Sequence, residues 1–173
     1  QWRDKAMQYN KDWLSEQIIK NRDSMYRFAL SIMKNHDDAC DAVSEAILHA
    51  YVNIGSLCFG EKFRSWVMTI LYNVCMNMLR SRVPYSDFDA EEKMYIPSSE
   101  ADITVKITLW DAVCALPSNY RSIVVLFYYD NLRIKEISNI TGLSLDNVKK
   151  RLSRAREMLR KSLRDWGGEN ISV

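Results

Sequence analysis

Apolar residues recur every three or four positions over most of this chain, which is the spacing of one buried face of an α-helix. The first such segment runs from about residue 12 to 34. A second, from about 38 to 54, follows Asp37, which we expect to be its N-cap. The expected core positions of both are Leu14, Ile18, Met25, Phe28, Ala29, Ile32, Val43, Ala46, Ile47, Ala50 and Ile54. With 5 Gly and 3 Pro, the chain has too few turn formers for a β-sandwich or barrel, so the predicted fold is all-α.

A third helix is predicted at about 61–82, after a loop at 55–60, with two distinct stripes. Its core stripe is Phe63, Val67, Ile70, Leu71, Val74 and Met78. The second stripe, within about 80° on the helix surface, is Lys62, Trp66, Thr69, Asn73, Asn77 and Arg80. Residues 62–82 carry four cations, Arg64 among them, and no carboxylate, which suits phosphate contact and stacking of an unpaired base on the indole. A solvated face with one half-buried Trp is the alternative interpretation.

Residues 83–105 interrupt the helical pattern and divide the chain. They hold two Pro, six carboxylates and one Lys, a net charge of −5, and have neither helical nor strand periodicity. We therefore expect a flexible acidic linker. The predicted architecture is two small helical domains, residues 1–82 and 106–173, joined by this segment.

The second domain contains a helix-turn-helix pattern. Pro117 suits the first turn of a helix that runs to about Tyr129. Further on, Gly142 permits a tight turn and Ser144 is placed to cap the next helix, while Ser138 is small where the two helices must approach. Leu143 fills the angle between them. The expected apolar contacts of the two helices are Ile134, Ile137, Ile140, Leu145, Val148, Leu152, Ala155 and Leu159.

The surface opposite this second core is strongly basic. Residues 144–164 carry eight Lys or Arg against two carboxylates, a net charge of +6. Arginine pairs with guanine and asparagine with adenine, whereas lysine binds phosphate as a point charge. The pattern therefore predicts a duplex-DNA interface, and a solvated basic helix in a plain αα-hairpin is the alternative. The residues expected at this interface are Asn147, Lys149, Lys150, Arg151, Ser153 and Arg154.

Composition narrows the remaining classes of function. The overall net charge of +2 would not by itself indicate nucleic acid. The 4 Cys form no C-x-x-C pair and the 2 His lie apart from them, so we expect incidental buried thiols in a reduced cytoplasmic protein, with no metal and no cofactor. No apolar run approaches a membrane span, and the polar start does not resemble a secretory signal. No nucleophile–base pair or phosphate-binding glycine loop is visible, so we expect no enzyme.

Taken in order, these segments resemble the small extracytoplasmic-function (ECF, group 4) RNA polymerase sigma factors of the sigma-70 family, which have only sigma domains two and four. The N-terminal resemblance lies in YRFALSIMKNHDDACDAVSEAILHAY and FRSWVMTILYNVCMNMLR. The C-terminal resemblance lies in ALPSNYRSIVVLFYYDNLRIKEISNITGLSLDNVKKRLSRAREMLR. It implies a protein that binds core RNA polymerase and directs promoter-specific initiation by recognising −35 and −10 elements and assisting strand opening.

The resemblance also implies roles for individual residues. The outer face of the second helix matches the surface that docks on the coiled coil of the largest polymerase subunit, namely Asp41, Ser44, Glu45 and Leu48. Ser44 replaces a common Gln, and Asn77 stands where the family usually has Asp. Asn73 matches an Asn that faces the −10 DNA. Together with the stripe described above, the expected −10 contacts are Lys62, Arg64, Trp66, Asn73, Asn77 and Arg80. The loop 55–61, with Cys58 and Phe59, matches the segment that captures a flipped base. The implied −35 contacts are Arg121, Asn147, Lys149, Lys150, Ser153 and Arg154, and Arg151, which flanks them on the helix, is expected to join them.

The implied partners are core RNA polymerase, through its largest-subunit coiled coil and its flap, promoter DNA, and an anti-sigma protein that is membrane-bound in most relatives. No direct contact of this chain with a membrane is expected. The acidic linker either occupies a basic RNA channel of the polymerase or serves as a solvated tether. The residues alone leave two other classes open, a dimeric regulator that binds duplex DNA without polymerase, and an enzyme or helical scaffold.

Overall fold

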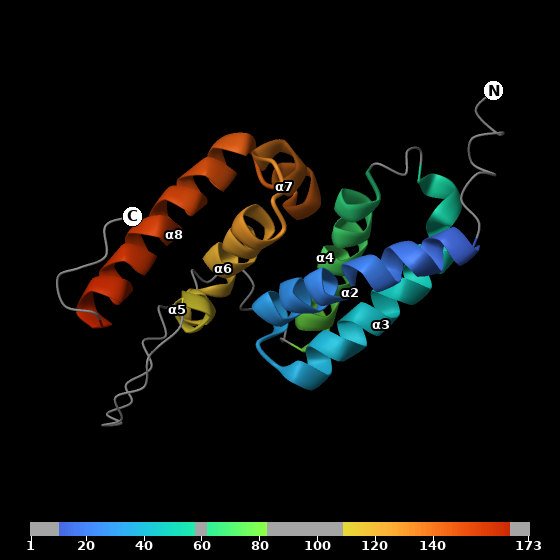
Figure 1. Ribbon diagram of the computed structural model, residues 1–173, viewed down its shortest axis with the longest axis horizontal. Helices are drawn as coiled ribbons and strands as arrows, with labels where there is room; N and C mark the ends of the chain where they lie inside the picture. The colour runs from blue at the N-terminus through green and yellow to red at the C-terminus, as the bar shows by residue number, and fades with distance from the viewer. Residues whose placement is uncertain (1–10, 58–61, 83–108, 167–173) are drawn as a thin grey trace.

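In the computed structural model, residues 11–57, 62–82 and 109–166 are described, and every regular element in these ranges is a helix. This confirms the all-α prediction. The helices form two groups that lie against each other (Figure 1). We call α2–α4 the N-terminal module and α5–α8 the C-terminal module. The predicted linker at 83–105 lies outside the described residues.

The N-terminal module consists of α2 (Lys11–Met33), α3 (His36–Asn53), the short 3-10 helix η1 (Ile54–Ser56) and α4 (Phe63–Arg82). The three long helices pack on one another around fully buried side chains such as Met25, Phe28 and Leu71. All six core positions predicted for α2 are buried.

The inward face of α3 is lined by small residues. We call Ala39, Ala42, Ala46 and Ala50, each with no exposed surface, the alanine seam. The distance between packed helices depends on the side chains at the contact, so methyl groups let α3 lie close to α2 and α4. The prediction that larger residues fill this face is wrong for Val43, Ile47 and Ile54, which are only half-buried at its edges.

The start of α3 also differs from the prediction. Its N-cap is Asn35, whose extended backbone (φ −132°, ψ 138°) lets the side-chain oxygen accept from the Asp38 amide at 3.0 Å. Asp37, predicted as the cap, instead lies in the first turn beside Asp38, where a carboxylate favours the helix dipole. Both are short polar side chains, and spacing alone did not distinguish them.

The C-terminal module consists of α5 (Leu109–Ala115), α6 (Ser118–Val124), the π-helical segment η3 (Val125–Tyr129), α7 (Ile134–Thr141) and α8 (Leu145–Trp166). The predicted helix from Pro117 to Tyr129 is therefore two helical segments, with Pro117 just outside the first.

The turn between α7 and α8 has the predicted geometry. Gly142 adopts φ +72°, and its amide donates to the Ser138 carbonyl at 2.9 Å. The Ser138 hydroxyl donates to the Leu143 carbonyl at 2.6 Å, and Ser144 accepts from the Asn147 amide at 3.3 Å. These contacts confirm a helix-turn-helix. Leu145 is 46% exposed, so its predicted place in the core is wrong.

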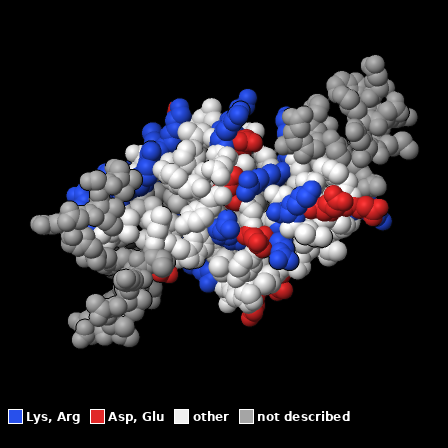
Figure 2. Space-filling view, in the orientation of Figure 1, with Lys and Arg blue, Asp and Glu red and all other residues white. Residues whose placement is uncertain are grey.

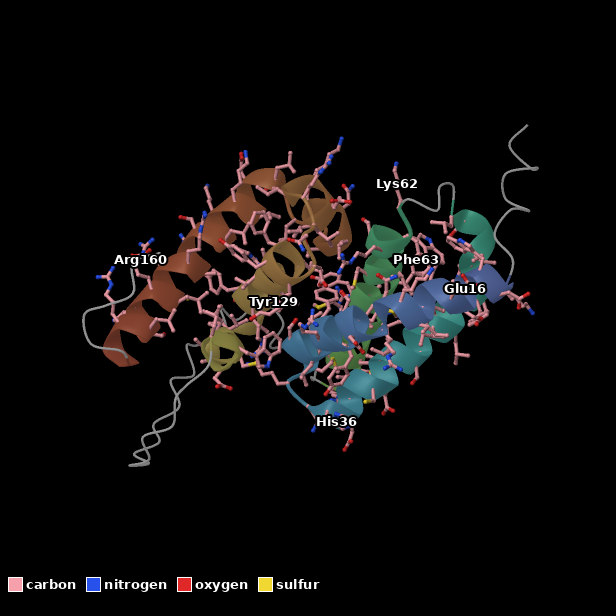
Figure 3. The ribbon with its side chains drawn as sticks, viewed as in Figure 1. Glu16, His36, Lys62, Phe63, Tyr129 and Arg160 are labelled. Atoms are coloured by element: carbon pink, nitrogen blue, oxygen red, sulfur yellow. The ribbon has the colours of Figure 1, made fainter. Side chains whose placement is uncertain are left out.

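The two modules share a contact surface. Helix α2 packs on α6 and η3, and α4 packs on α7. The buried apolar residues of both modules form one continuous cluster. Tyr129, labelled in Figure 3, lies where η3 faces α2, and the Arg27 guanidinium stands 5.5 Å from the centre of its ring.

Candidate nucleic-acid and polymerase interfaces

The outer face of α8 carries the predicted −35 residues. Val148, Leu152 and Ala155 are buried on its inner side. The predicted contact residues on its exposed side are Asn147, Lys149, Lys150, Ser153 and Arg154. Figure 2 shows Lys and Arg along the upper left edge of the molecule, the place of α8 in Figure 1, and Arg160 points outward there in Figure 3. The tertiary packing thus leaves this basic face open.

Arg151 has a different environment from its neighbours. Its side chain is half-buried, and Nη1 donates to the Asn119 carbonyl at 3.4 Å. This bond joins α8 to the start of α6. Arg151 therefore supports the orientation of α8 within its module.

Arg121, also predicted at the −35 interface, is 4% exposed. Its Nε donates to the Ser31 carbonyl at the end of α2, and its Nη1 donates to the Cys114 carbonyl, both at 2.5 Å. In this conformation its guanidinium is directed at the N-terminal module. A helical wheel could not reveal this, because the acceptors come from distant parts of the chain.

The predicted −10 face of α4 is largely accessible. Asn73, Asn77 and Arg80 are exposed, and Lys62 points away from the start of α4 (Figure 3). Trp66 is half-buried, its Nε1 donates to Ser56 Oγ at 3.2 Å, and its ring lies 5.9 Å from that of Phe63. The indole, which belongs to α4, is thus held against η1. Residues 58–61 of the predicted base-capturing loop, with Cys58 and Phe59, lie outside the described part of the chain.

Arg64 is the exception on α4. Its Nη2 donates to Asp130 Oδ1 at 3.0 Å and to Ser24 Oγ at 2.9 Å, and the Ser24 hydroxyl donates to the same carboxylate. Asp130 is 1% exposed, and burial raises the pKa of its carboxyl group, against the opposing effects of Ser24, Arg64 and Arg27. The sequence did not reveal Ser24 or Asp130 as partners of Arg64. Ser24 lies within a helix and Asp130 in a loop, and neither belongs to a recognisable motif.

The outer face of α3 presents the predicted polymerase-docking residues. Asp41, Ser44, Glu45 and Leu48 are all exposed, on the side opposite the alanine seam. Glu45 Oε1 lies 3.8 Å from His49 Nε2, and the Ser44 hydroxyl donates to the Cys40 carbonyl. Val52, one turn after Leu48, is 83% exposed and extends the strip. The prediction missed it, although the spacing of four residues would have placed it there.

In the described residues the potential metal ligands are dispersed, and the three cysteines are free thiols. No group of three or more potential metal ligands occurs within 11–57, 62–82 and 109–166. Cys75 is buried, as predicted, but Cys40 is half-buried and Cys114 is exposed. Burial raises the pKa of the Cys75 thiol to about 12. Among the helices of these ranges, none is long and apolar enough to cross a membrane.

Comparison with known families matches both modules. The model described as sigma-70 region 2 matches residues 18–83, and the one described as sigma-70, region 4 matches residues 106–159. RNA polymerase sigma factor SigV of Bacillus subtilis is 31% identical over 156 residues, covering 90% of this chain and 94% of that protein. ECF RNA polymerase sigma factor SigW of the same organism is 32% identical over 171 residues, covering 90% and 91%.

Solved structures have the same fold. The sigma factor RpoE from Bartonella quintana, in complex with the anti-sigma factor NepR, matches with a TM-score of 0.69 and 25% identity, over 90% of this chain and 98% of that chain. CnrH, in complex with the cytosolic domain of CnrY, matches with a TM-score of 0.64 and 18% identity, over 94% of each chain. With two relatives above 30% identity along most of its length, this chain belongs to the ECF sigma factors of the sigma-70 family, non-catalytic proteins of promoter-specific transcription initiation.

Proposed function

We propose that this sigma factor docks on core RNA polymerase through the outer face of α3, reads a −35 element with α8 and engages the −10 element with α4. The observation that carries the proposal is the one-sided basic face of α8 behind a formed helix-turn-helix. A recognition helix of this kind enters the major groove. Arg154 and Asn147 are the base-reading candidates, and Lys149 and Lys150 the phosphate contacts.

The −10 role rests on the stripe of α4. Amides at Asn73 and Asn77 and cations at Lys62 and Arg80 offer donors to phosphates and base edges. Trp66 offers a face on which an unpaired base can stack, worth about 1–3 kcal/mol. Because extruding a base costs a few kcal/mol, Trp66 alone does not open the duplex. Polymerase contacts to the rest of the bubble must supply the difference.

The docking role rests on the acidic and apolar strip of α3. Asp41 and Glu45 supply charge, and Leu48 and Val52 supply exposed apolar area beside it. A basic helical surface with apolar side chains would complement this strip, as the coiled coil of the polymerase does in the family resemblance. The flap of the polymerase is the corresponding partner for the C-terminal module.

An anti-sigma protein is the proposed regulatory partner. RpoE, the similar structure at 25% identity, is bound to the anti-sigma factor NepR. A protein that covers α3 and α8 together would block polymerase and DNA at once. We propose that such a partner holds this chain until a signal releases it, and that the partner is membrane-bound.

The test is run-off transcription with core polymerase on a library of promoter sequences. Arg154→Ala is expected to lose about 1–3 kcal/mol of discrimination at one −35 position if Arg154 reads a base, and to weaken all promoters alike if it contacts phosphate. Arg164→Ala, an exposed arginine in the last turn of the same helix, is the matched control. A chain that binds core polymerase without starting any transcript would refute the proposed function.

A further inference from the structure

Three polar side chains contact one another in series where α2 turns into α3. The Tyr26 hydroxyl, from α2, lies 2.8 Å from His36 Nδ1, and the two rings meet edge to face. His36 Nε2 in turn lies 3.8 Å from Cys40 Sγ, a long hydrogen bond of the kind that sulfur makes. His36 is the first residue of α3 and lies at the turn itself (Figure 3). We call these three side chains the Tyr26–His36–Cys40 relay.

The relay has the order of a nucleophile, its base and a group that orients the base. When the Tyr26 oxygen accepts from Nδ1–H, Nε2 keeps the lone pair that faces the thiol and can accept its proton. The thiolate is the nucleophilic form of cysteine. The expectation that both histidines lie apart from the cysteines is wrong for His36, because residues four apart on a helix are neighbours.

Cys40 also differs in environment from the other cysteines of the described ranges. Cys75 is buried, and burial raises the pKa of its thiol to about 12. Cys114 is exposed, but partial desolvation raises the pKa of its thiol as well. Cys40 is half-buried beside an exposed imidazole, so a small reagent in solution reaches both the sulfur and its base.

We propose that Cys40 is a thiol-modification site that takes a low-molecular-weight disulfide of the glutathione type. His36 Nε2 accepts the Cys40 proton as the thiolate attacks one sulfur of the disulfide. A new S–S bond joins Cys40 to that sulfur, the S–S bond of the reagent breaks, and the departing thiolate takes the proton from His36. Cys40 is oxidised and the departing half of the reagent is reduced.

The exchange uses the imidazole twice, first as a base and then as an acid, and it needs no cofactor. Its product is a mixed disulfide on Cys40. A reducing thiol reverses it by the same chemistry, since a thiolate attacks the mixed disulfide in turn. The modification is therefore a reversible change of the α3 surface.

The adduct lies at the edge of the proposed polymerase-docking face. Cys40 directly precedes Asp41, and its carbonyl accepts from the Ser44 hydroxyl one turn further along α3. A group of the size of a tripeptide at this edge obstructs the close approach of a helical partner. We therefore expect the modification to weaken docking. This consequence rests on the proposed function, whereas exchange at Cys40 does not.

The test treats the full chain with oxidised glutathione near neutral pH and follows each cysteine by peptide mass spectrometry. An unassisted thiol is a few per cent ionised there, so a base can raise its exchange rate by at most about thirtyfold. Within that limit, His36→Gln is expected to slow exchange at Cys40 by about tenfold and to leave Cys114 unchanged. His49→Gln removes the other histidine of α3 and is the matched control, expected to change neither rate.

Tyr26 is tested as a positioning residue. Tyr26→Phe removes the hydroxyl that accepts from Nδ1–H, so exchange at Cys40 is expected to slow, but less than in His36→Gln. The ¹⁵N chemical shifts of the His36 ring report its tautomer, which a merely structural substitution would not move. A preference for Nδ1–H that is lost in Tyr26→Phe supports the relay. Slower exchange with an unchanged tautomer would contradict the role of Tyr26.

Binding to core polymerase separates the site from its consequence. Modification of the wild-type chain is expected to lower its affinity by about tenfold, which corresponds to about 1.4 kcal/mol. Cys40→Ser is expected to keep its affinity under the same treatment. Exchange at Cys40 that is no faster than at Cys114, or that His36→Gln leaves unchanged, would overturn the proposed site. Exchange that depends on His36 but leaves the affinity unchanged would support the site and contradict docking through α3.

Discussion

At the scale of single residues, Arg82 ties the end of α4 to the beginning of α3. Its Nη1 and Nη2 donate to the two carboxylate oxygens of Asp38 at 2.5 and 2.6 Å. Such a bidentate pair is geometrically specific, but its exposure to solvent keeps its contribution to stability small. Its clearest consequence is therefore for the charge of Asp38.

The pair makes Asp38 titrate at a lower pH than an ordinary aspartate. The hydrogen bond from Arg82 holds the pKa of the Asp38 carboxyl below its usual 3.8. A lowered folded-state pKa means that the pair stabilises the fold above pH 3.8, and that this contribution is lost as the pH falls through the folded-state pKa. NMR titration of the carboxyl carbon is expected to give a midpoint below 3.8. Arg82→Gln should move it up, and Arg80→Gln, two residues away, should not.

The exposure of residues on a clearly amphipathic helix could be predicted from the sequence. Asn147, Lys149, Lys150 and Arg154 lie on a helix whose buried side is marked by regular apolar spacing, so their exposure followed from the sequence. Their role in DNA binding stays a prediction. Arg64 could not be placed in the same way, because the carboxylate that it bonds is brought near only by packing of the second module.

At the scale of elements, the turn between α7 and α8 depends on one left-handed residue. Gly142, at φ +72°, has open space on the side where a Cβ would lie, with no neighbouring atom within 4 Å of it. A side chain there would therefore strain the backbone without a clash. This separates the conformational cost of a substitution from any packing cost.

Gly142→Ala is expected to lower the free energy of unfolding of the C-terminal module by about 1 kcal/mol. The left-handed conformation costs roughly 1–2 kcal/mol for alanine, and reduced freedom of the unfolded chain offsets part of this. Gly55→Ala is the matched control, since Gly55 also has open space but no positive φ. Urea unfolding followed by circular dichroism measures both, and equal effects of the two substitutions would contradict the explanation.

The positions of the helices were predicted better than the residues at which they begin and end. The 3.6-residue period located all the long helices and the helix-turn-helix, because each has one clear buried side. The cap of α3 was misplaced by two residues because Asn35 and Asp37 have similar capping ability. The change from α6 to the π-helical η3 was missed, since it leaves no mark in the apolar spacing.

At the scale of the whole molecule, one chain carries the two modules that we propose to bind promoter DNA. Under the proposed function polymerase fixes their separation, so that binding of one module raises the effective concentration of the other, which can add a factor of about 10² to 10⁴ in affinity. The free chain lacks this fixed geometry, and in the structure its modules face each other.

A gel shift on a full promoter fragment, with and without core polymerase, tests this dependence. The free chain is expected to bind at least about a hundredfold more weakly than the holoenzyme. A promoter with only the −35 element is the control, and it should lose most of the difference. Tight sequence-specific binding by the free chain would instead favour the dimeric regulator that the residues alone left open.

The contact between the modules was the feature of the molecule that the sequence predicted least. Its partners come from α2, α4, α6 and the residue after η3, and no period or motif links these positions. Composition indicated the separation into two helical units, but their mutual packing depends on surface complementarity that a single sequence does not display.

The alanine seam has an evolutionary consequence for α3. Because the helix meets its own module through the alanine seam and the half-buried side chains at its edges, its folding depends little on which side chains lie on the opposite side. Mutations at Asp41, Ser44, Glu45 or Leu48 are therefore nearly free of folding constraint. Under the proposed docking role of this face, sister copies that arise by gene duplication can diverge in their affinity for one polymerase while they retain the same fold.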